Sequence, residues 1–296
     1  MGKDPPWRLY RWNGANRPGV MKDQYLHVDG VRIRYWHSGE NGAPVLLVHG
    51  FGASVEWWVR NVAALAAHHR VYVLDLPGFG QSERLPEMLS LSLATGFLRR
   101  FLQAVEVPRA HVVGNSLGGL IAMQFSLQFP EAVDRLVLVS PAGFGRQVHW
   151  IFRLIPLPLL GRWLARPDRR KLEMFHRRFI HGDSSWLTAD WLDRVRALAV
   201  LPGASEMLHD VARVGVSLGG IKASILRPLH EELSTLITST LIVWGGRDRL
   251  VPPEQAEIGR RLLPNARVHI FPGCGHCPQL ERATEFNELL LAFFNP

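Results

Sequence analysis

The sequence contains a serine in the setting that nucleophilic catalysis requires. Gly114-Asn115-Ser116-Leu117-Gly118-Gly119 follows the apolar run His111–Val113 and precedes a segment with helical character. A serine on a sharp turn between a strand and a helix presents its hydroxyl to a cleft, and small flanking residues relieve the crowding of the turn. The spacing therefore predicts Ser116 as a nucleophile, with the backbone N–H of Leu117 free beside it.

Two later residues have the types that would activate such a serine. Asp248 follows the apolar run Thr240–Trp244, and His276 lies in the Gly-rich stretch after Arg267–Phe271. An acid just past the carboxyl end of a strand can accept a hydrogen bond from histidine Nδ1–H, which leaves Nε2 to take the serine proton. The sequence thus predicts a triad of Ser116, His276 and Asp248.

A second Gly-rich turn could hold the negative charge that develops on the substrate. His49-Gly50-Phe51-Gly52 follows the apolar run Pro44–Val48, and glycine lets a backbone approach a ligand closely. We expect the N–H groups of Phe51 and Leu117 to form an oxyanion hole. Gly50 and Asn115 are predicted to contact the substrate.

Several of these groups have a second interpretation. Asp248 could stabilise its own turn, and His49 is interpreted as a structural histidine that braces its loop. Cys274, His276 and Cys277 could bind a metal ion, but structural zinc takes four ligands and the sequence has no second cysteine pair. We therefore predict neither a metal nor a cofactor.

The elements around these motifs alternate between strand and helix. Short, continuously apolar runs are typical of strands buried on both faces of a parallel sheet, and they lie at 44–48, 70–74, 111–113, 135–139, 240–244 and 267–271. Helical segments are predicted at 57–67, 91–105, 117–129, 255–263 and 284–294. A hairpin at 27–35, with Asp29-Gly30 in its turn, precedes them. The predicted fold class is α/β, with a mostly parallel, doubly wound sheet.

This alternation stops between residues 144 and 234. The segment has helical periodicity, many Arg and Trp residues, several prolines and no buried-strand run. We predict an N-terminal arm at 1–22, a core made of 23–144 and 237–296, and an inserted helical cap at 145–236.

The composition limits the partners of the chain. Its formal charge is +8, and we interpret the basic residues as scattered over the surface, without a recognised nucleic-acid module. The sequence lacks a secretory signal and has no run near the ~20 apolar residues of a transmembrane helix. We expect a cytoplasmic monomer or homodimer with no nucleic-acid partner and no stable membrane insertion. The apolar run at 154–160 leaves a membrane-associated lipase as an alternative.

From about residue 24 to the C-terminus, apart from the cap, the sequence resembles the α/β-hydrolase superfamily. LLVHGFG, VLDLPGFGQSE, VVGNSLGG, LVLVSPAG, LIVWGGRDRLVP and PGCGHCPQLE occur in the order and spacing of that superfamily. The chain order of serine, acid and histidine is also that of the superfamily. Within it, the sequence is similar to carboxylesterases and to carbon–carbon hydrolases that cleave meta-ring-fission products.

The sequence departs from the carbon–carbon hydrolases at two motifs. They usually have HGxGPG and a tryptophan after the catalytic histidine, whereas this chain has HGFGAS and Cys277. In the carbon–carbon hydrolases, an arginine of the cap binds the substrate carboxylate. Arg194 and Arg196 lie in the corresponding region of this sequence and are the candidates for that role. Haloalkane dehalogenases and epoxide hydrolases use an aspartate at the position of Ser116, which argues against both.

The resemblance implies hydrolysis of a small-molecule carboxylic ester through an acyl-enzyme. Carbon–carbon hydrolysis of a vinylogous diketone acid is the alternative reaction. The alternative that is not an enzyme is a non-catalytic binding protein that has kept the hydrolase scaffold. Such proteins normally lack one of the three triad residues.

Overall fold

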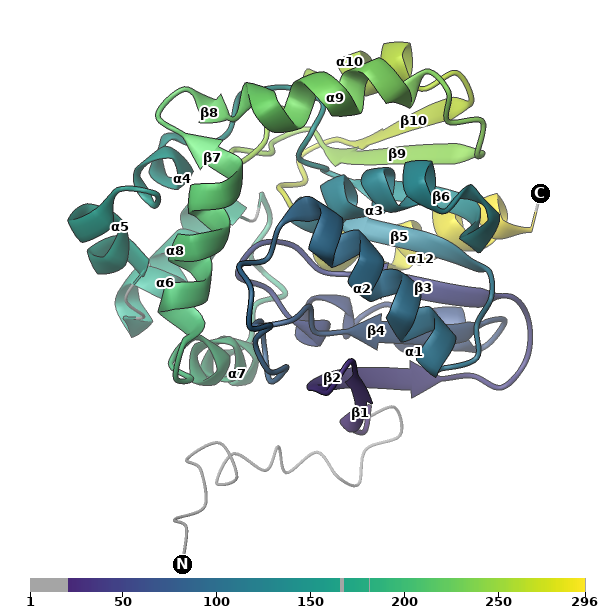
Figure 1. Ribbon diagram of the computed structural model, residues 1–296, viewed down its shortest axis with the longest axis horizontal. Helices are drawn as coiled ribbons and strands as arrows, with labels where there is room; N and C mark the ends of the chain where they lie inside the picture. Colours follow the sequence, from purple (N-terminus) through teal and green to yellow (C-terminus); the bar gives the residue numbers. More distant parts are fainter. Residues whose placement is uncertain (1–20, 166–167, 181, 296) are drawn as a thin grey trace, which may run out of the picture.

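Eight strands form one sheet, in the order β1-β2-β4-β3-β5-β6-β9-β10 (Figure 1). The structure, a computed structural model, describes residues 21–165, 168–180 and 182–295. The strands of this sheet are β1 (Gln24–Val28), β2 (Val31–Ser38), β3 (Pro44–Val48), β4 (Arg70–Leu74), β5 (Ala110–Asn115), β6 (Val133–Val139), β9 (Thr240–Gly245) and β10 (Ala266–Phe271). Strand β2 runs antiparallel to both neighbours, and the other pairs are parallel. The predicted mostly parallel sheet is confirmed.

The predicted hairpin joins β1 to β2. Val28 and Val31 face each other across the turn, so Asp29 and Gly30 are its two central residues. Their φ angles of 51° and 78° are the left-handed values of a two-residue turn that matches the strand twist.

Helices cover both faces of the sheet. The α-helices outside the insertion are α1 (Val62–Ala66), α2 (Leu91–Ala104), α3 (Leu117–Gln128), α10 (Gln255–Leu262), α11 (Pro278–Glu281) and α12 (Ala283–Phe294), and two 3-10 helices lie at Val55–Trp58 and Pro130–Ala132. Helix α1 contacts α12, and α2 contacts α3. Figure 1 shows α2 and α3 in front of the strands and α12 behind them. These two layers are the doubly wound arrangement that the sequence predicts.

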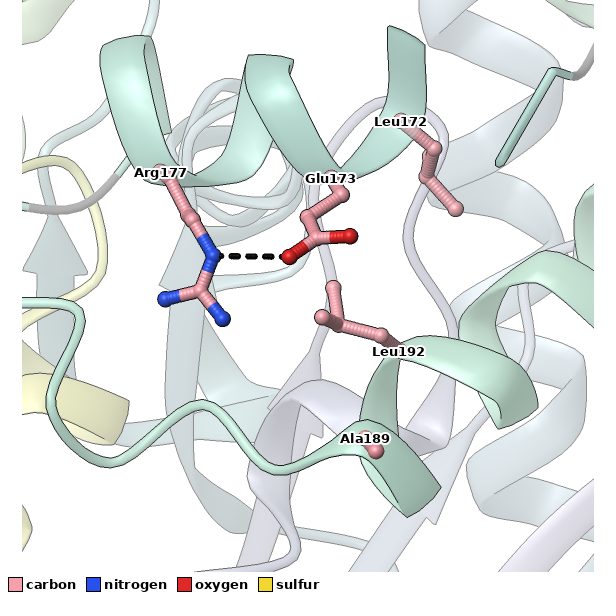
Figure 2. Close-up of a pocket in the computed structure, with 5 residues that line it drawn as sticks. All are labelled: Leu172, Glu173, Arg177, Ala189 and Leu192. Atoms are coloured by element: carbon pink, nitrogen blue, oxygen red, sulfur yellow. Dashed lines mark hydrogen bonds and ion pairs between the residues drawn. The ribbon is translucent and has the colours of Figure 1, made fainter. Parts of the chain in front are cut away.

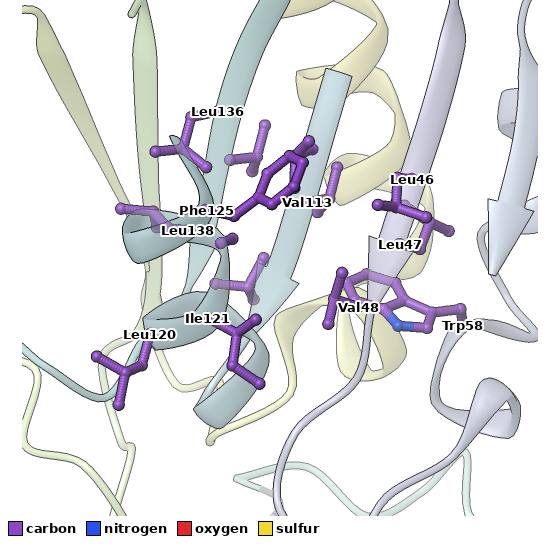
Figure 3. Packing of buried hydrophobic residues seen from close by; sticks show 14 of the residues in the cluster. Leu46, Leu47, Val48, Trp58, Val113, Leu120, Ile121, Phe125, Leu136 and Leu138 are labelled. Atoms are coloured by element: carbon purple, nitrogen blue, oxygen red, sulfur yellow. The ribbon is translucent and has the colours of Figure 1, made fainter. Parts of the chain in front are cut away.

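The core lies between the central strands and α3 (Figure 3). Leu46, Leu47 and Val48 of β3 have no exposed surface, and neither has Phe125 of α3. Because α3 is apolar on most of its surface, it is suited to a position buried on all sides. The serine turn at its start is thereby held on a rigid support.

The insertion between β6 and β9 is mainly helical. It contains α4 (Trp150–Leu154), α5 (Pro158–Ala165), α6 (Arg169–Phe175), a π-helical turn (His176–Ile180), α7 (Ala189–Ala199), α8 (Ala204–Gly215), the two-residue strands β7 (Val216–Ser217) and β8 (Gly220–Ile221), and α9 (Ala223–Leu233). Helices α4 to α8 lie together to one side of the sheet (Figure 1). Helix α9 instead packs on α3, so it lies with the core although it falls within the predicted cap range. The arm predicted at 1–22 lies almost entirely outside the described residues.

Within the described ranges, no helix is long and apolar enough to cross a membrane.

Candidate active site

Ser116 occupies the turn between β5 and α3. Its backbone has φ 56° and ψ −116°, a conformation that a residue with a side chain rarely adopts. The turn is held because the N–H of Ser116 donates to the carbonyl of Val139, at 2.9 Å, and its own carbonyl accepts from Ala142, at 3.0 Å. The surrounding backbone therefore fixes Ser116 in a strained position of the kind expected for a nucleophile.

Two glycines of the motif are required by close backbone contacts. A Cβ atom at Gly114 would lie 2.2 Å from the carbonyl oxygen of Gly118, and one at Gly118 would lie 2.4 Å from that of Val48. Both distances are far below van der Waals contact. The G-x-S-x-G spacing thus reflects the tight approach of β3, β5 and α3 beneath Ser116.

Asp248 and His276 form a buried pair. The Nδ1 atom of His276 lies 2.7 Å from Oδ2 of Asp248. The other oxygen of Asp248, Oδ1, accepts from the N–H groups of Leu250 and Val251, at 2.8 and 3.0 Å. Because Asp248 is acceptor-only in its ionised form, it makes His276 carry its proton on Nδ1 and leaves Nε2 available as a base.

The loops that carry these two residues are joined by their backbones. Arg247 N–H donates to the carbonyl of Cys274, at 2.7 Å, and Gly246 N–H donates to Phe271, at 2.9 Å. A Cβ atom at Gly245 would lie 1.8 Å from the carbonyl oxygen of Gly275. Residues separated by about 30 positions in sequence are thereby fixed in register at the end of β9 and β10.

The predicted oxyanion loop lies directly against the serine turn. A Cβ atom at Gly50 would be 3.0 Å from Cβ of Ser116, so only glycine fits without a shift. Phe51 lines the same cavity as Ser116, and Leu117 is the first residue of α3. In the described part of the chain, the N–H groups of Phe51 and Leu117 form no hydrogen bond. Both are therefore available as donors.

His49 braces this loop from below. Its Nε2 accepts from the N–H of Leu76, at 2.9 Å, so the proton is on Nδ1, which lies 2.8 Å from the carbonyl of Gly50. Burial lowers the pKa of His49 to about 4. A neutral histidine therefore joins the loop to the end of β4, which is the structural role predicted for it.

Asn115 has its side chain turned toward the backbone around the site. Its amide donates to the carbonyl of Val139, at 3.0 Å, and to that of His276, at 3.4 Å. This contact brings the serine turn and the histidine loop together. Asn115 and Gly50 both line the cavity described next, where contact with a substrate remains a prediction.

Ser116 and His276 line one cavity of about 400 Å³ between core and cap. Its wall is mainly aliphatic and aromatic, and Phe51 of the core meets Phe152 of α4 there, with ring centroids 5.8 Å apart. Among the described residues, Lys171 is the one lysine or arginine in the wall. The cavity therefore suits a substrate that is apolar on both sides of the reacting bond.

Neither predicted cap arginine lies in this wall. Arg194 of α7 instead donates to Glu56, with Nε 2.9 Å from Oε1. Arg196 is exposed. The candidates for binding a substrate carboxylate are therefore placed elsewhere.

Arg194 belongs to a buried charge network that the sequence did not reveal. Arg34, fully buried, has Nη2 2.6 Å from Oε1 of Glu56 and Nη1 3.3 Å from Oδ2 of Asp75. Burial raises the pKa of Asp75 to about 6, with Glu56 adding to the effect and Arg34 opposing it. Although burial opposes it, Arg34 lowers the pKa of Glu56 to about 2. Through Glu56, in the 3-10 turn Val55–Trp58 that follows the oxyanion loop, the network joins β2 and the end of β4 to the cap helix α7.

Glu281 of α11 is a second residue near the site that the sequence did not reveal. Its carboxylate accepts from the N–H of Gly275, at 2.9 Å, and from those of Gly182 and Asp183, each at 2.9 Å. It thereby connects the histidine loop to the cap. Its place at the end of the motif PGCGHCPQLE is the sequence signal that could have indicated it.

The two cysteines flank His276 and are buried. Burial raises the pKa of both the Cys274 and the Cys277 thiol. Metal binding needs thiolates, so this environment is unfavourable for it. Among the described residues, no group of three or more His, Cys, Asp or Glu side chains is arranged to hold a metal ion.

A smaller cavity of about 140 Å³ lies between α6 and α7 (Figure 2). Its two charged groups, Glu173 and Arg177, pair with each other at 3.0 Å. Leu172, Ala189 and Leu192 complete the wall. Because its charges are already paired, this cavity offers no reactive group comparable to Ser116.

Comparison with known proteins agrees with this fold. Residues 43–283 match the family described as the alpha/beta hydrolase fold. The dihydrolipoyllysine-residue acetyltransferase component of the acetoin cleaving system of Cupriavidus necator is 33% identical over 267 residues, covering 90% of this chain and 67% of the relative. A 2-hydroxy-6-oxononadienedioate/2-hydroxy-6-oxononatrienedioate hydrolase of Paraburkholderia phymatum is 31% identical over 281 residues, covering 89% and 91%.

The architecture is also similar to that of solved structures. A crystal structure of a bacterial membrane phospholipase A superposes with a TM-score of 0.78 at 29% identity, covering 93% of this chain and 86% of the other. Together with the family match over most of the sequence, these similarities show that the chain belongs to the alpha/beta hydrolase fold family.

Proposed function

We propose that this protein hydrolyses carboxylic esters with an apolar acyl or alcohol group, through an acyl-enzyme on Ser116. The observation that carries the proposal is the buried Asp248–His276 pair, which opens into the same apolar cavity as the strained Ser116. A purely structural histidine would not need a buried carboxylate on Nδ1 together with a place in the wall of the cavity that Ser116 also lines.

In the first half of the reaction, Ser116 Oγ attacks the ester carbonyl carbon while His276 Nε2 takes its proton. The carbonyl oxygen becomes negatively charged and accepts hydrogen bonds from the N–H groups of Phe51 and Leu117. One such donor typically stabilises the transition state by about 3 kcal/mol. When the C–O bond breaks, His276 gives its proton to the departing alcohol. A water molecule, deprotonated by His276, then hydrolyses the acyl-enzyme and restores Ser116.

The alternative is carbon–carbon hydrolysis of a vinylogous diketone acid. The 31% identical dienedioate hydrolase favours it. The cavity wall favours the ester, because it is mainly apolar and Lys171, the one lysine or arginine that the described residues place in it, is exposed. A carboxylate buried deeper in the cavity would have no lysine or arginine beside it, and an unpaired buried charge is strongly unfavourable.

The first test is labelling with a fluorophosphonate, followed by mass spectrometry of the modified peptide. We expect a covalent adduct on Ser116 in the wild type, none in Ser116→Ala, and full labelling in the control Ser205→Ala, whose serine is partly exposed and lies outside the cavity wall. Absence of the adduct in the wild type would favour a non-catalytic binding protein.

The second test separates the two reactions. The wild type should hydrolyse p-nitrophenyl butyrate, and Ser116→Ala should lower kcat/KM by about 10⁴-fold or more while leaving the fold intact. If a meta-ring-fission product gave a kcat/KM orders of magnitude above that of the ester, the ester assignment would be wrong.

A further inference from the structure

Exposed apolar side chains concentrate on one part of the cap. We call residues 150–165 and 168–180 the cap rim; it consists of α4, α5, α6 and the π-helical turn, at the left edge of the molecule in Figure 1. Of the ten large hydrophobic side chains that the described residues expose, five are here: Trp150, Leu159, Leu160, Trp163 and Met174. Leu159 is 87% exposed, and the two tryptophans are more than half exposed. Apolar patches of this kind on a protein surface mark interaction sites.

The same segment is strongly basic. Among the side chains that the structure describes, the cap rim has six Lys or Arg and two Asp or Glu residues, a net charge of +4 in a chain whose formal total is +8. Both acids are engaged: Glu173 pairs with Arg177, and Asp168 accepts from the N–H of Lys171 at 2.9 Å. The basic charge is therefore concentrated here and is not scattered evenly, as the sequence pattern had suggested.

The catalytic cavity opens at this surface. Trp163 and Met174 line the cavity and are also 52% and 57% exposed, so they lie at its mouth. Lys171, another lining residue, is exposed, and its Nζ lies 4.1 Å from the centre of the Trp163 ring. This contact joins α5 to α6 and places a cation and an indole together at the entrance.

We propose that the cap rim docks on an anionic lipid bilayer and that the enzyme takes its ester substrate, with an apolar acyl chain, from that surface. The substrate part of this inference rests on the proposed function. Tryptophan is favoured at the interface between headgroups and acyl chains, while Lys and Arg are attracted to anionic lipid. Apolar tips such as Leu159 would enter the acyl boundary, as in other peripheral helices.

The positive charge of the cap rim favours a bilayer over a second copy of the chain as the partner that covers this surface. Two cap rims brought face to face would place a charge of +4 against another of +4, whereas an anionic leaflet has the opposite charge. The cavity mouth within the patch would then face the acyl chains, and the apolar wall would receive one without passage through water.

The test is co-sedimentation of the full chain with vesicles of phosphatidylcholine alone and of phosphatidylcholine mixed with phosphatidylglycerol. We expect binding to the anionic vesicles only, weakened by salt because screening shortens the reach of exposed charges. Arg162→Gln/Arg170→Gln should lower the affinity about 30-fold, roughly fivefold for each charge near the surface. Leu159→Ser/Leu160→Ser should lower it by about tenfold or more, through lost apolar burial.

Matched variants outside the cap rim provide the controls. Arg227→Gln/Arg261→Gln removes the same charge and Ile237→Ser/Ile270→Ser removes exposed apolar side chains, so both should bind like the wild type. Hydrolysis of a soluble short-chain ester should be unchanged in all four double variants. Ser116→Ala should bind vesicles normally, which separates docking from catalysis.

Three outcomes would overturn the proposal: no preference for anionic vesicles, equal losses in rim and control variants, or a wild-type dimer that Leu159→Ser/Leu160→Ser converts to a monomer. The last would show that a second copy covers the rim. Ester hydrolysis that persists without vesicle binding would leave the proposed function standing. Vesicle binding without hydrolysis would reject that function and the substrate part of the inference, leaving the docking itself supported.

Discussion

The backbone N–H of His276 donates a hydrogen bond of 2.7 Å to the carbonyl oxygen of Ile180, in the cap. The residue proposed as the base is therefore attached on one side to the acid Asp248 and on the other to the element that closes the cavity. Glu281 reinforces this connection, because its carboxylate accepts from backbone N–H groups of both the histidine loop and the cap. A change in the cap would be transmitted to His276 directly.

Glu281→Ala should lower both stability and catalytic efficiency. The variant leaves the buried N–H of Gly275 without its acceptor, and an unsatisfied buried donor costs about 1–3 kcal/mol. We expect a loss of about 3 kcal/mol in the free energy of unfolding by urea, and a fall in kcat larger than any change in KM. Glu281→Gln, which keeps one oxygen acceptor, should recover part of both losses.

Glu285→Ala is the control, since Glu285 is exposed on the adjacent helix. It should behave like the wild type. A Glu281→Ala protein with wild-type kcat would show that the connection between cap and histidine loop does not affect catalysis.

Asp248→Asn should reduce kcat for the ester by about 10⁴-fold while leaving the fold intact. The N–H groups of Leu250 and Val251 require an oxygen at the Oδ1 position, so the new amide NH2 must face His276. It would donate to Nδ1 and force the ring proton onto Nε2, where it blocks the acceptance of the serine proton. Steady-state kinetics measures the effect, with Asp134→Asn, at a partly exposed residue on β6, as the control. A loss below tenfold would argue that Asp248 is only a turn residue.

Local patterns were sufficient to predict the sheet and the serine turn. Pro44–Val48 and Arg70–Leu74 have the predicted bounds, because strands buried on both faces must be continuously apolar. The Gly114 to Gly119 motif was equally informative, since steric contact with the neighbouring backbone dictates its glycines. These features depend on residues close in sequence.

Features that depend on distant residues could not be predicted in this way. Glu56, Arg34 and Arg194 meet in one network although up to 160 positions separate them, and an isolated Glu or Arg has no periodicity that predicts a buried partner. Charges on the cap rim were interpreted as scattered because the pattern along the chain does not show which helices fold onto one surface. Helix α9 resembles a cap helix in composition, and only its packing on α3 places it with the core.

The stability of the protein should fall as pH decreases from 7 to 5, in part because of His49. Its pKa is about 4 in the folded protein and near 6.5 when unfolded, because burial disfavours the charged ring. A base whose folded pKa is lowered contributes stability that is present above the unfolded pKa and is lost as pH falls from 6.5 toward 4. Between pH 7 and 5 the loss should be about 2 kcal/mol.

Urea unfolding at both pH values checks this expectation. The side chain of His49→Gln cannot be protonated. Between pH 7 and 5, this variant should therefore lose about 2 kcal/mol less unfolding free energy than the wild type, whatever its absolute stability. His27→Gln is the control, because His27 is exposed. If His49→Gln had the pH dependence of the wild type, His49 would not be held neutral in the folded protein.

Arg194→Gln should weaken the attachment of the cap without changing the preference among substrates. Arg194 has Nη2 2.8 Å from Oε1 of Glu56 and is partly buried, so its removal should cost about 1–2 kcal/mol of unfolding free energy. The ratio of kcat/KM for a neutral ester to that for an ester bearing a terminal carboxylate should stay within about twofold of wild type, because Arg194 lies outside the cavity wall. Arg196→Gln, exposed on the same helix, should change neither stability nor the ratio. If Arg194→Gln lowered kcat/KM for the carboxylate-bearing ester alone, Arg194 would have to break its ion pair with Glu56 and bind the substrate. That result would favour the carbon–carbon hydrolase assignment.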